Sequence, residues 1–505
     1  MPVFAAVDIG ANSVRLKIAR LLRRRLTVVH EDREVTRLGG QVFASGLLAP
    51  QAIAQTVKAL SRFHRAGQEH GADVVRVVAT SALRDARNAR AFTDWVRAAT
   101  GWRVEVISGL EEGRLIHLGL VSHLRVARGR VLMADLGGGS CELTVSEAGH
   151  IRDMFSLPLG AVRLTHEFLA HDPAKKKELA RLREYVGEQL DRVSARIVAA
   201  RLPLLLGTSG TVAALSGRAA ALTGRRGPVS RRTVIGIAES LQRMDTAGRA
   251  ALRGIGPRRA EIIVSGAIVF AELMERCHLP TLRYSPLGLR DGLLAQMAAD
   301  QDRSPALRQH IEAERSDALQ AVGRQYRVDV GHAQHVRTLA LQLFQGLRAI
   351  HDLPAEYAEW IGAAAMLHEV GGFLNRAGRH RHSYYIIAHS EILGFSIAER
   401  RLIAAIARFQ GKSRPSPLDR ISRTLPEADR LHLGKAVILL RLARALNQGR
   451  RGAVTEVKVR VQADQVALRL ATKRSGAELE LWAFAKERSY FREVFGRDVA
   501  AVLTA

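Results

Sequence analysis

Two short segments of the chain carry the same set of residues, suited to holding phosphate and a metal ion. Each reads Asp-(Ile/Leu)-Gly-x-x-Ser, over residues 8–13 and 135–140, and each follows an apolar run typical of a buried strand. A tight glycine-containing turn directs successive backbone N–H groups to one place, where they can hold anionic oxygens. Asp8 and Asp135 would repel phosphate there unless Mg²⁺ lies between them. The repeat predicts two similar domains that face one another.

A third loop of small polar residues, 207–211, follows the apolar run 202–206. One glycine-rich turn is a weak indication, because most such turns only reverse the direction of the chain. Three such loops, two of them matched, are much more specific and indicate a shared phosphate-binding cleft.

The elements that must position these loops alternate between strands and helices. Strands are predicted over 5–9, 14–19, 73–79, 104–107, 131–135, 141–146 and 202–206. Helices are predicted over 89–98, 111–124 and 212–215, and 151–203 is expected to be mostly helical. This mixture predicts an α/β fold for the first 300 residues.

The remainder of the chain changes character. A polar, proline-containing segment predicts a linker near residue 303, and the pattern then stays helical to about residue 448. After a second linker at 449–452, an alternating run from Val454 predicts a small β-rich domain. We therefore expect domains over 1–126, 127–303, 304–449 and 450–505.

The composition limits the class of protein. The 505 residues include 76 Lys and Arg against 49 Asp and Glu, a net charge of +27, and the hydrophobic fraction of 47% is that of a globular chain. This charge indicates either a polyanionic partner or a drift in composition toward arginine. Two distant cysteines, Cys141 and Cys277, exclude a disulfide framework and a four-thiolate metal site. We see no signal peptide or membrane span and expect a cytoplasmic protein without a membrane partner.

Six segments, in order along the first 300 residues, resemble the motifs of the exopolyphosphatase and guanosine pentaphosphate phosphohydrolase (Ppx/GppA) family. They are 6–13 (AVDIGANS), 79–84 (ATSALR), 107–115 (ISGLEEGRL), 135–142 (DLGGGSCE), 207–211 (GTSGT) and 288–292 (GLRDG). The resemblance is to the long form of the family. It implies two actin-like (ribonuclease H-like) ATPase-fold domains, an all-α HD-like domain and a small β-rich C-terminal domain.

The resemblance also implies roles for individual residues. Glu112 matches the family's catalytic base, which would activate water for in-line attack on the terminal phosphorus. Without the resemblance, such a residue would be interpreted as a carboxylate favoured by the helix dipole. Asp135 and Glu142 match positions associated with Mg²⁺ or another divalent cation, with Asp8 nearby. The expected phosphate contacts are Asn12, Ser13, Arg84, Gly137, Gly138, Gly139, Ser140, Ser209 and Gly210.

Cys141 stands where relatives often carry Thr. The substitution removes a hydroxyl donor, although the backbone turn should survive. A thiol at this place could also make the site sensitive to oxidation.

The stretch 304–449 resembles a metal-dependent HD phosphohydrolase domain. The matching segments are 331–335 (GHAQH), 366–371 (MLHEVG), 380–383 (HRHS) and 389–390 (HS). The His-Asp pair is replaced by His368-Glu369, and Asn447 occupies the closing aspartate position, so we expect no working metal centre. The resemblance implies that such degenerate domains extend a basic channel for the polymer. The residues that fit contacts to a polyanion are His380, Arg381 and His382.

Several functions remain open at this point. The leading one is an exopolyphosphatase that releases terminal phosphate from inorganic polyphosphate, and hydrolysis of guanosine pentaphosphate is the alternative within the same chemistry. A kinase of the same superfamily would keep the loops but not the water-activating role of Glu112, and a polyphosphate- or nucleic acid-binding regulator would be non-catalytic. Nucleic acid is disfavoured as a partner, because aromatic residues make up only 5% of the chain. We also expect a homodimer.

Overall fold

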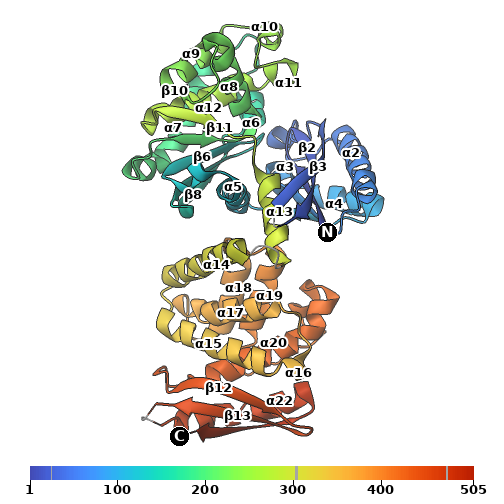
Figure 1. Ribbon diagram of the computed structural model, residues 1–505, viewed down its shortest axis with the longest axis vertical. Coiled ribbons are helices and arrows are strands. Elements are labelled where there is room, and N and C mark those ends of the chain that lie inside the picture. The colour runs from blue at the N-terminus through green and yellow to red at the C-terminus, as the bar shows by residue number, and fades with distance from the viewer. Residues whose placement is uncertain (24, 302–304, 474–475, 505) are drawn as a thin grey trace. The chain divides into compact units, whose positions relative to one another are not determined.

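The computed structural model describes residues 1–23, 25–301, 305–473 and 476–504 (Figure 1). The chain divides into two compact units, Met1–Ile311 and Glu312–Ala505, called here the N-terminal and the C-terminal unit. The division falls within helix α14 (Pro305–Gln325). The linker predicted near residue 303 lies at residues 302–304, outside the described part of the chain.

The N-terminal unit begins with a five-stranded sheet in the order β3-β2-β1-β4-β5. Its strands are β1 (Val3–Ile9), β2 (Ser13–Leu22), β3 (Arg25–Val35), β4 (Val74–Ala79) and β5 (Val104–Val106). β1 pairs antiparallel with β2 and parallel with β4. Asp8 is therefore close to the end of a central strand, where the chain leaves the sheet.

A second sheet repeats this plan in the order β10-β11-β9-β6-β7-β8. Its strands are β6 (Val131–Leu136), β7 (Cys141–Glu147), β8 (His150–Leu157), β9 (Leu205–Gly207), β10 (Val229–Ser230) and β11 (Thr281–Tyr284). β6 pairs antiparallel with β7 and parallel with β9, as β1 does with β2 and β4. The repeat predicted from two hairpins is confirmed and extends to five strands of each sheet.

Helices cover both sheets. They are α1 (Val42–Ser45), α2 (Pro50–Glu69), α3 (Ser81–Asp85), α4 (Ala89–Thr100), α5 (Gly109–His123), α6 (Ala161–Phe168), α7 (Lys176–Ala199), α8 (Ser209–Thr223), α9 (Arg231–Gln242), α10 (Thr246–Ala251), α11 (Pro257–Ala260), α12 (Ile263–Arg276) and α13 (Leu289–Asp300), with a 3-10 turn at Arg125–Arg128. α5 and α13 pack in a core shared with β1 of the first sheet and β6 of the second. The two helices approach closely, because a Cβ on Gly292 would lie 1.7 Å from the carbonyl oxygen of Leu115. This core fixes α5, whose first turn carries Glu112.

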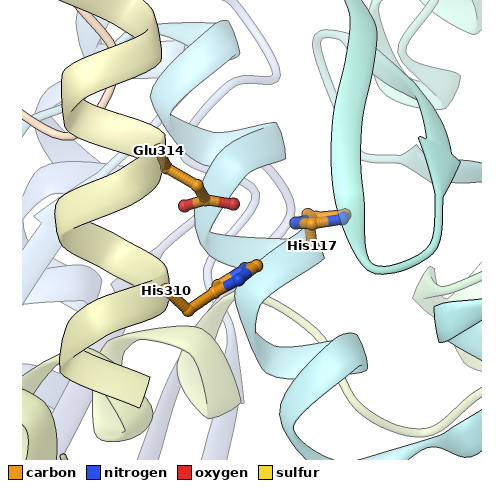
Figure 2. Close-up of side chains that lie close together, drawn as sticks. All are labelled: His117, His310 and Glu314. Carbon is orange, nitrogen blue, oxygen red and sulfur yellow. The ribbon is translucent and has the colours of Figure 1, made fainter. Parts of the chain in front are cut away.

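The first turns of α14 pack against the rest of the N-terminal unit. Ile311 lies in an apolar cluster with residues of α5 and α13. The His310 ring lies 6.3 Å from the ring of His117 and 5.4 Å from that of His150, measured between centroids. Figure 2 shows His117 of α5 and His310 of α14 close together. These contacts hold the end of the N-terminal unit to its body.

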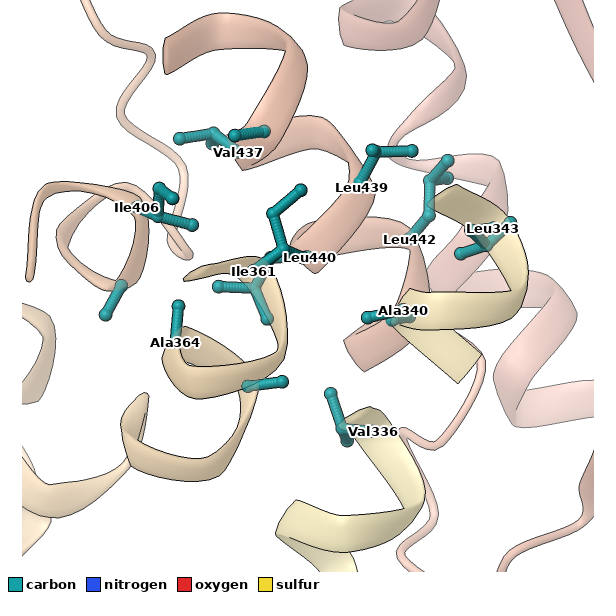
Figure 3. Packing of buried hydrophobic residues seen from close by; sticks show 14 of the residues in the cluster. Val336, Ala340, Leu343, Ile361, Ala364, Ile406, Val437, Leu439, Leu440 and Leu442 are labelled. Carbon is teal, nitrogen blue, oxygen red and sulfur yellow. The ribbon is translucent and has the colours of Figure 1, made fainter. Parts of the chain in front are cut away.

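The C-terminal unit combines helices with a three-stranded sheet in the order β12-β13-β14. Its elements are α15 (Val330–Gly346), α16 (Arg348–His351), α17 (Tyr357–Leu367), α18 (Arg379–His389), α19 (Ile397–Arg408), α20 (Glu427–Ala445), β12 (Val454–Val461), β13 (Gln465–Thr472), α21 (Glu478–Ala485), α22 (Arg488–Phe495) and β14 (Asp498–Thr504), with 3-10 turns at Val370–Phe373 and Ser422–Thr424. Figure 3 shows Val336, Ile361, Ile406 and Leu440 converging in its centre from α15, α17, α19 and α20. Val454 of β12 belongs to the same core. The helical and β-rich segments therefore form one compact unit.

Two parts of the sequence-based reading need correction. Part of the stretch 151–203, expected to be mostly helical, is strand β8, which pairs antiparallel with β7. Strand β3 was not predicted, because most of its side chains are exposed or half-buried and give no apolar run. Within the described residues, no helix has the length and apolarity that crossing a membrane demands.

Candidate active site

The two repeated loops close the β1–β2 and β6–β7 hairpins with the same geometry. Gly10 N–H donates to the carbonyl oxygen of Ser13 at 3.2 Å, and Gly137 N–H donates to that of Ser140 at 2.9 Å. The loops touch, because a Cβ built on Gly138 would lie 2.8 Å from the Cβ of Ala11. The predicted meeting of the two loops is confirmed.

The glycines of the second loop serve this packing. A Cβ on Gly139 would lie 2.5 Å from Ser81 Oγ and 2.4 Å from the ring of Phe43, and Gly160 packs directly against the Gly139 backbone. Gly138 is required by the contact with the first loop. We had expected these glycines to give the backbone access to phosphate, but Gly139 is packed against protein atoms and lies outside the lining of the cavity described next.

A small cavity of about 70 Å³ lies where the loops meet. The predicted site residues that line it are Asp8, Asn12, Ser13, Glu112, Asp135, Gly137, Gly138, Ser140, Ser209 and Gly210. It adjoins a larger cavity of about 450 Å³, which shares Asp8, Glu112 and Asp135 with it. All six motif segments of the sequence contribute residues to the linings of these two adjoining cavities in the N-terminal unit.

Glu112 is held in this space by the start of α5 and by Arg84. Ser108 caps the helix by accepting the Glu111 N–H at 3.1 Å, which orients the first turn. Arg84 Nη1 lies 3.2 Å from Glu112 Oε2, and its Nη2 donates to Ser140 Oγ at 3.2 Å. Arg84 therefore joins Glu112 to the second loop. Glu111, by contrast, is directed at Arg114, with which it forms two hydrogen bonds of 2.8 and 2.9 Å.

Carboxylates crowd together beside Glu112. Glu112, Asp135 and Glu142 each place an oxygen within 4.8 Å of the other two. Burial, and then the charge of Glu142, raise the pKa of Glu112 well above its usual range. Burial also raises the pKa of Glu142 to about 7, against the opposing charge of Arg84. Groups with such pKa values are characteristic of functional sites.

The crowded carboxylates fit a hard divalent cation. Such ions prefer oxygen ligands, and a dication offsets the repulsion among the three acidic groups. Glu142 Oε1 accepts a hydrogen bond from Ser156 at 2.9 Å. Glu142 Oε2 is buried and, within the described part of the chain, has no hydrogen-bond partner. Burial raises the pKa of Asp8 as well, while Arg15 and Arg290 oppose this effect.

The third loop fixes Asp135 and adds a buried hydroxyl to the site. Thr208 Oγ1 donates a short hydrogen bond to Asp135 Oδ1 and fixes that carboxylate. Ser209 begins α8 with φ +79°, a backbone conformation that is rare outside glycine. Among the described residues, Ser209 Oγ and Asn12 Nδ2 are buried without a hydrogen-bond partner. Buried donors of this kind require a ligand or water.

Four arginines that the sequence analysis did not single out line one or both of these cavities. They are Arg15, Arg33, Arg259 and Arg290. Burial, reinforced by Arg15, lowers the pKa of both Arg33 and Arg259 to about 10. Arg259 lies over the third loop, since a Cβ on Gly210 would be 1.8 Å from Arg259 Nη2. Their mutual repulsion shows a concentration of positive charge suited to a polyanion.

The surroundings of Cys141 argue against the redox sensitivity that its position suggested. Its side chain is 1% exposed. Burial, and then the charge of Glu142, raise the pKa of the thiol well above its usual value. The reactive form of cysteine is the thiolate, so burial and the raised pKa both disfavour reaction of this thiol in the folded chain.

The three residues predicted to contact the polymer lie in the C-terminal unit. His380, Arg381 and His382 occupy the first turn of α18. Burial, and then the charges of Arg408 and Arg381, lower the pKa of His380, so this turn faces other cations. Their contact with the polymer stays a prediction.

Comparison with known proteins identifies the family of both units. Residues 17–301 match the model of the Ppx/GppA phosphatase family, and residues 315–481 match that of domain III of the Ppx/GppA phosphatases. The chain is 26% identical over 493 residues to the guanosine-5'-triphosphate,3'-diphosphate pyrophosphatase of Vibrio vulnificus, covering 95% of this chain and 96% of the relative. It is 32% identical over 295 residues to exopolyphosphatase 1 of Mycobacterium leprae, covering 57% and 87%.

Solved structures agree with this assignment. A crystal structure of the Aquifex aeolicus Ppx/GppA family member is 28% identical, covers 60% of this chain and 99% of its own, and superposes with a TM-score of 0.51. An exopolyphosphatase from Cytophaga hutchinsonii, 23% identical over 58% of this chain and 97% of its own, shares the fold with a TM-score of 0.55. The chain belongs to the Ppx/GppA phosphatase family.

Proposed function

We propose that the chain is an exopolyphosphatase, a phosphoric anhydride hydrolase that releases the terminal phosphate of inorganic polyphosphate. One observation carries the proposal: a buried carboxylate cluster around Glu112 opens into a cavity lined by Arg15, Arg33 and Arg290. Carboxylates can activate water and hold a metal ion, and arginines bind phosphate oxygens in pairs. The name of the Mycobacterium leprae relative supports this choice.

The terminal phosphate would bind between the two repeated loops. Ser13 and Ser140 would donate to its oxygens, together with Asn12 Nδ2 and Ser209 Oγ, which have no hydrogen-bond partner among the described residues. Mg²⁺ or another divalent cation held by Asp135 and Glu142, with Asp8 nearby, would neutralise phosphate charge. The next phosphates of the chain would lie along the arginines of the larger cavity.

Glu112 would act as the general base. Its raised pKa makes this carboxylate a stronger proton acceptor than an ordinary one, which suits a general base. Arg84 holds one of its oxygens and opposes its protonation. The attacking water gives one proton to Glu112, its oxygen bonds to the terminal phosphorus, and the bond to the bridging oxygen breaks. Inorganic phosphate leaves, and the polymer is one residue shorter.

Hydrolysis of guanosine pentaphosphate is the second candidate. It rests on the relative from Vibrio vulnificus, whose similarity extends over 95% of this chain and so includes the C-terminal unit. The chemistry at the terminal phosphate would be the same. We further infer actin-like folds for 1–126 and 127–303 and an HD-like fold for 304–449. A homodimer and a cytoplasmic location stay predictions.

Phosphate release from long-chain polyphosphate and from guanosine pentaphosphate, measured side by side with Mg²⁺, tests the proposal. Faster release from polyphosphate at matched concentrations of terminal phosphate is the expected result. Faster release from the nucleotide would favour the second candidate. Absence of release from both would contradict a hydrolase and point to a binding protein.

A further inference from the structure

The HD-like residues of the C-terminal unit come together as the sequence suggested. His332, His368 and Glu369 each place a potential ligand atom within 4.8 Å of the other two. The rings of His332 and His368 lie 5.8 Å apart between centroids. Taken by residue type alone, two imidazoles and a carboxylate would suit a transition metal. The hydrogen bonds and charges around them indicate a different ligand.

Asn447 sets the protonation of His332. The backbone N–H of Gly452 donates to Asn447 Oδ1 at 3.1 Å, which fixes which end of the amide is oxygen. The other end, Nδ2, is a donor and lies 2.9 Å from His332 Nδ1. The neutral ring must therefore accept at Nδ1 and carry its proton on Nε2. In this state His332 donates a hydrogen bond at Nε2 and cannot bind a metal there.

His368 has the opposite arrangement. It is fully buried, and its Nδ1 lies 2.7 Å from the carbonyl oxygen of Ala365, so Nδ1 carries the proton. Its Nε2 is left with a lone pair that, among the described residues, has no hydrogen-bond partner. A buried acceptor without a partner requires a donor from a ligand or water. The centre therefore offers one donor, His332, beside one acceptor, His368.

Positive charge dominates the surroundings of this centre. Glu369 Oε1 lies 2.5 Å from Arg450 Nη2 and 3.3 Å from Arg379 Nη1. Arg444 is close enough to influence both histidines, and its Nε is buried without a partner in the described part of the chain. Two guanidinium groups thus pair with a single carboxylate, and a third guanidinium carries a buried donor nearby.

The other nearby carboxylates are already engaged. Glu487 accepts from Arg441 Nε at 2.7 Å, and Asp329 caps α15 by accepting the His332 N–H at 3.0 Å. A divalent cation would enter a region of net positive charge, whereas an anion would lower its energy. The side chains of Arg379 and Arg450 are 40% and 44% exposed, so solvent reaches these two members of the centre.

We propose that this centre, formed by Arg379, Arg444 and Arg450 with His332 and His368, is a binding site for a monohydrogen phosphate group. Its oxygens would accept from the guanidinium groups and from His332 Nε2–H. Its single P–O–H would donate to His368 Nε2. The group is either inorganic phosphate or the protonated end of a polyphosphate chain. The site belongs to the C-terminal unit alone and does not depend on the reaction assigned to Glu112.

The test uses the full chain with ¹³C-labelled histidine, so that the rings of His332 and His368 report on this site only. Single substitutions assign the two signals, and inorganic phosphate, tripolyphosphate and sulfate are titrated separately at pH 7.5. Both signals should shift with phosphate and saturate. Sulfate has the same charge but no proton to donate, so we expect its affinity to be about fivefold lower. The ratio between phosphate and tripolyphosphate identifies the physiological source.

Substitutions distinguish phosphate binding at this centre from attraction by the general positive charge of the chain. Arg444→Met should weaken phosphate at least about tenfold, since it removes a charged donor. Arg469→Met, on the exposed face of β13, is the matched control and should change nothing. If the first variant fails to fold, Arg450→Met, at an exposed position, serves in its place. Asn447→Asp should abolish the phosphate shifts for two reasons. The negative charge of the new side chain repels the anion. Its carboxylate also accepts only from a protonated Nδ1 of His332, so the neutral ring then has no proton on Nε2.

Three results would overturn the proposal. One is the absence of a phosphate-dependent shift in both signals. The second is an equal response to phosphate in the Arg444 and Arg469 variants. The third is saturable binding of Zn²⁺ at these histidines in the unmodified chain, with phosphate having no effect.

Discussion

Replacing Glu142 by Gln should stabilise the metal-free protein at alkaline pH. In the folded chain, burial raises the pKa of Glu142 from 4.5 to about 7. Between these two values the folded chain keeps a proton that the unfolded chain has released, so stability falls as the pH rises through this range. The penalty is complete above pH 7 and amounts to about 3 kcal/mol.

Gln keeps the shape of the side chain and can still accept from Ser156, but it has no charge to bury. At pH 8 the variant should therefore unfold about 5 °C higher than the unmodified chain, from the entropy of unfolding of a unit of this size. At pH 5 the difference in unfolding free energy should shrink to about 1 kcal/mol. With saturating Mg²⁺ the unmodified chain should unfold at the higher temperature, since only the chain with Glu142 gains the full binding energy of the metal ion.

Calorimetry of the N-terminal unit's transition in the full chain, with EDTA at pH 5 and pH 8, measures this effect. Glu275→Gln, on the exposed side of α12, makes the same chemical change without burial and should have little effect. If Glu142→Gln melts at or below the unmodified chain at pH 8 without metal, the reasoning from carboxylate crowding is refuted.

Three further changes probe the loops, the arginines and the thiol. Gly138→Ala should reduce phosphate release at least about tenfold, because its Cβ would lie 2.8 Å from Ala11. Gly236→Ala, on the exposed side of α9 with no atom within 4 Å of the added Cβ, should stay close to normal, and equal rates would contradict the loop contact. Arg259→Met should raise the KM for polyphosphate about tenfold with a smaller change in kcat, and an unchanged KM would exclude a substrate contact. A thiol reagent at pH 8 should leave Cys141 unmodified until the chain unfolds, so rapid labelling of the native protein would contradict its burial.

The loops could be predicted from the sequence because their signal is local. A strand, a turn with Gly10 or Gly137 and a second strand lie within 20 residues, and the repetition of the pattern marks it as more than a turn. The resemblance to the family added Glu112, Arg84 and Glu142, which lie on elements without such a signature.

The arginines of the cavity could not be found in this way. The chain contains 66 Arg, and nothing local separates Arg33 or Arg259 from the exposed ones. Arg15 and Arg290 lay beside or inside quoted motifs but had no assigned role. Their importance comes from being brought together in space, which depends on the packing of two sheets and of α13.

In the C-terminal unit the sequence identified an important residue but not its effect on a neighbour. The sequence revealed that Asn447 replaces an acidic ligand, but it did not show the consequence for His332. That consequence depends on the N–H of Gly452, which fixes the orientation of the amide. Hydrogen bonds between distant residues therefore decide whether the centre suits a cation or an anion.

The role of Glu112 is the central claim and can be tested directly. The initial rate of phosphate release from long-chain polyphosphate with Mg²⁺ is compared for the unmodified chain, Glu112→Gln and the exposed control Glu275→Gln. The account predicts that Glu112→Gln loses about two to four orders of magnitude in rate while its affinity for polyphosphate changes by less than about threefold. A Glu112→Gln variant that releases phosphate as fast as the control would contradict the account.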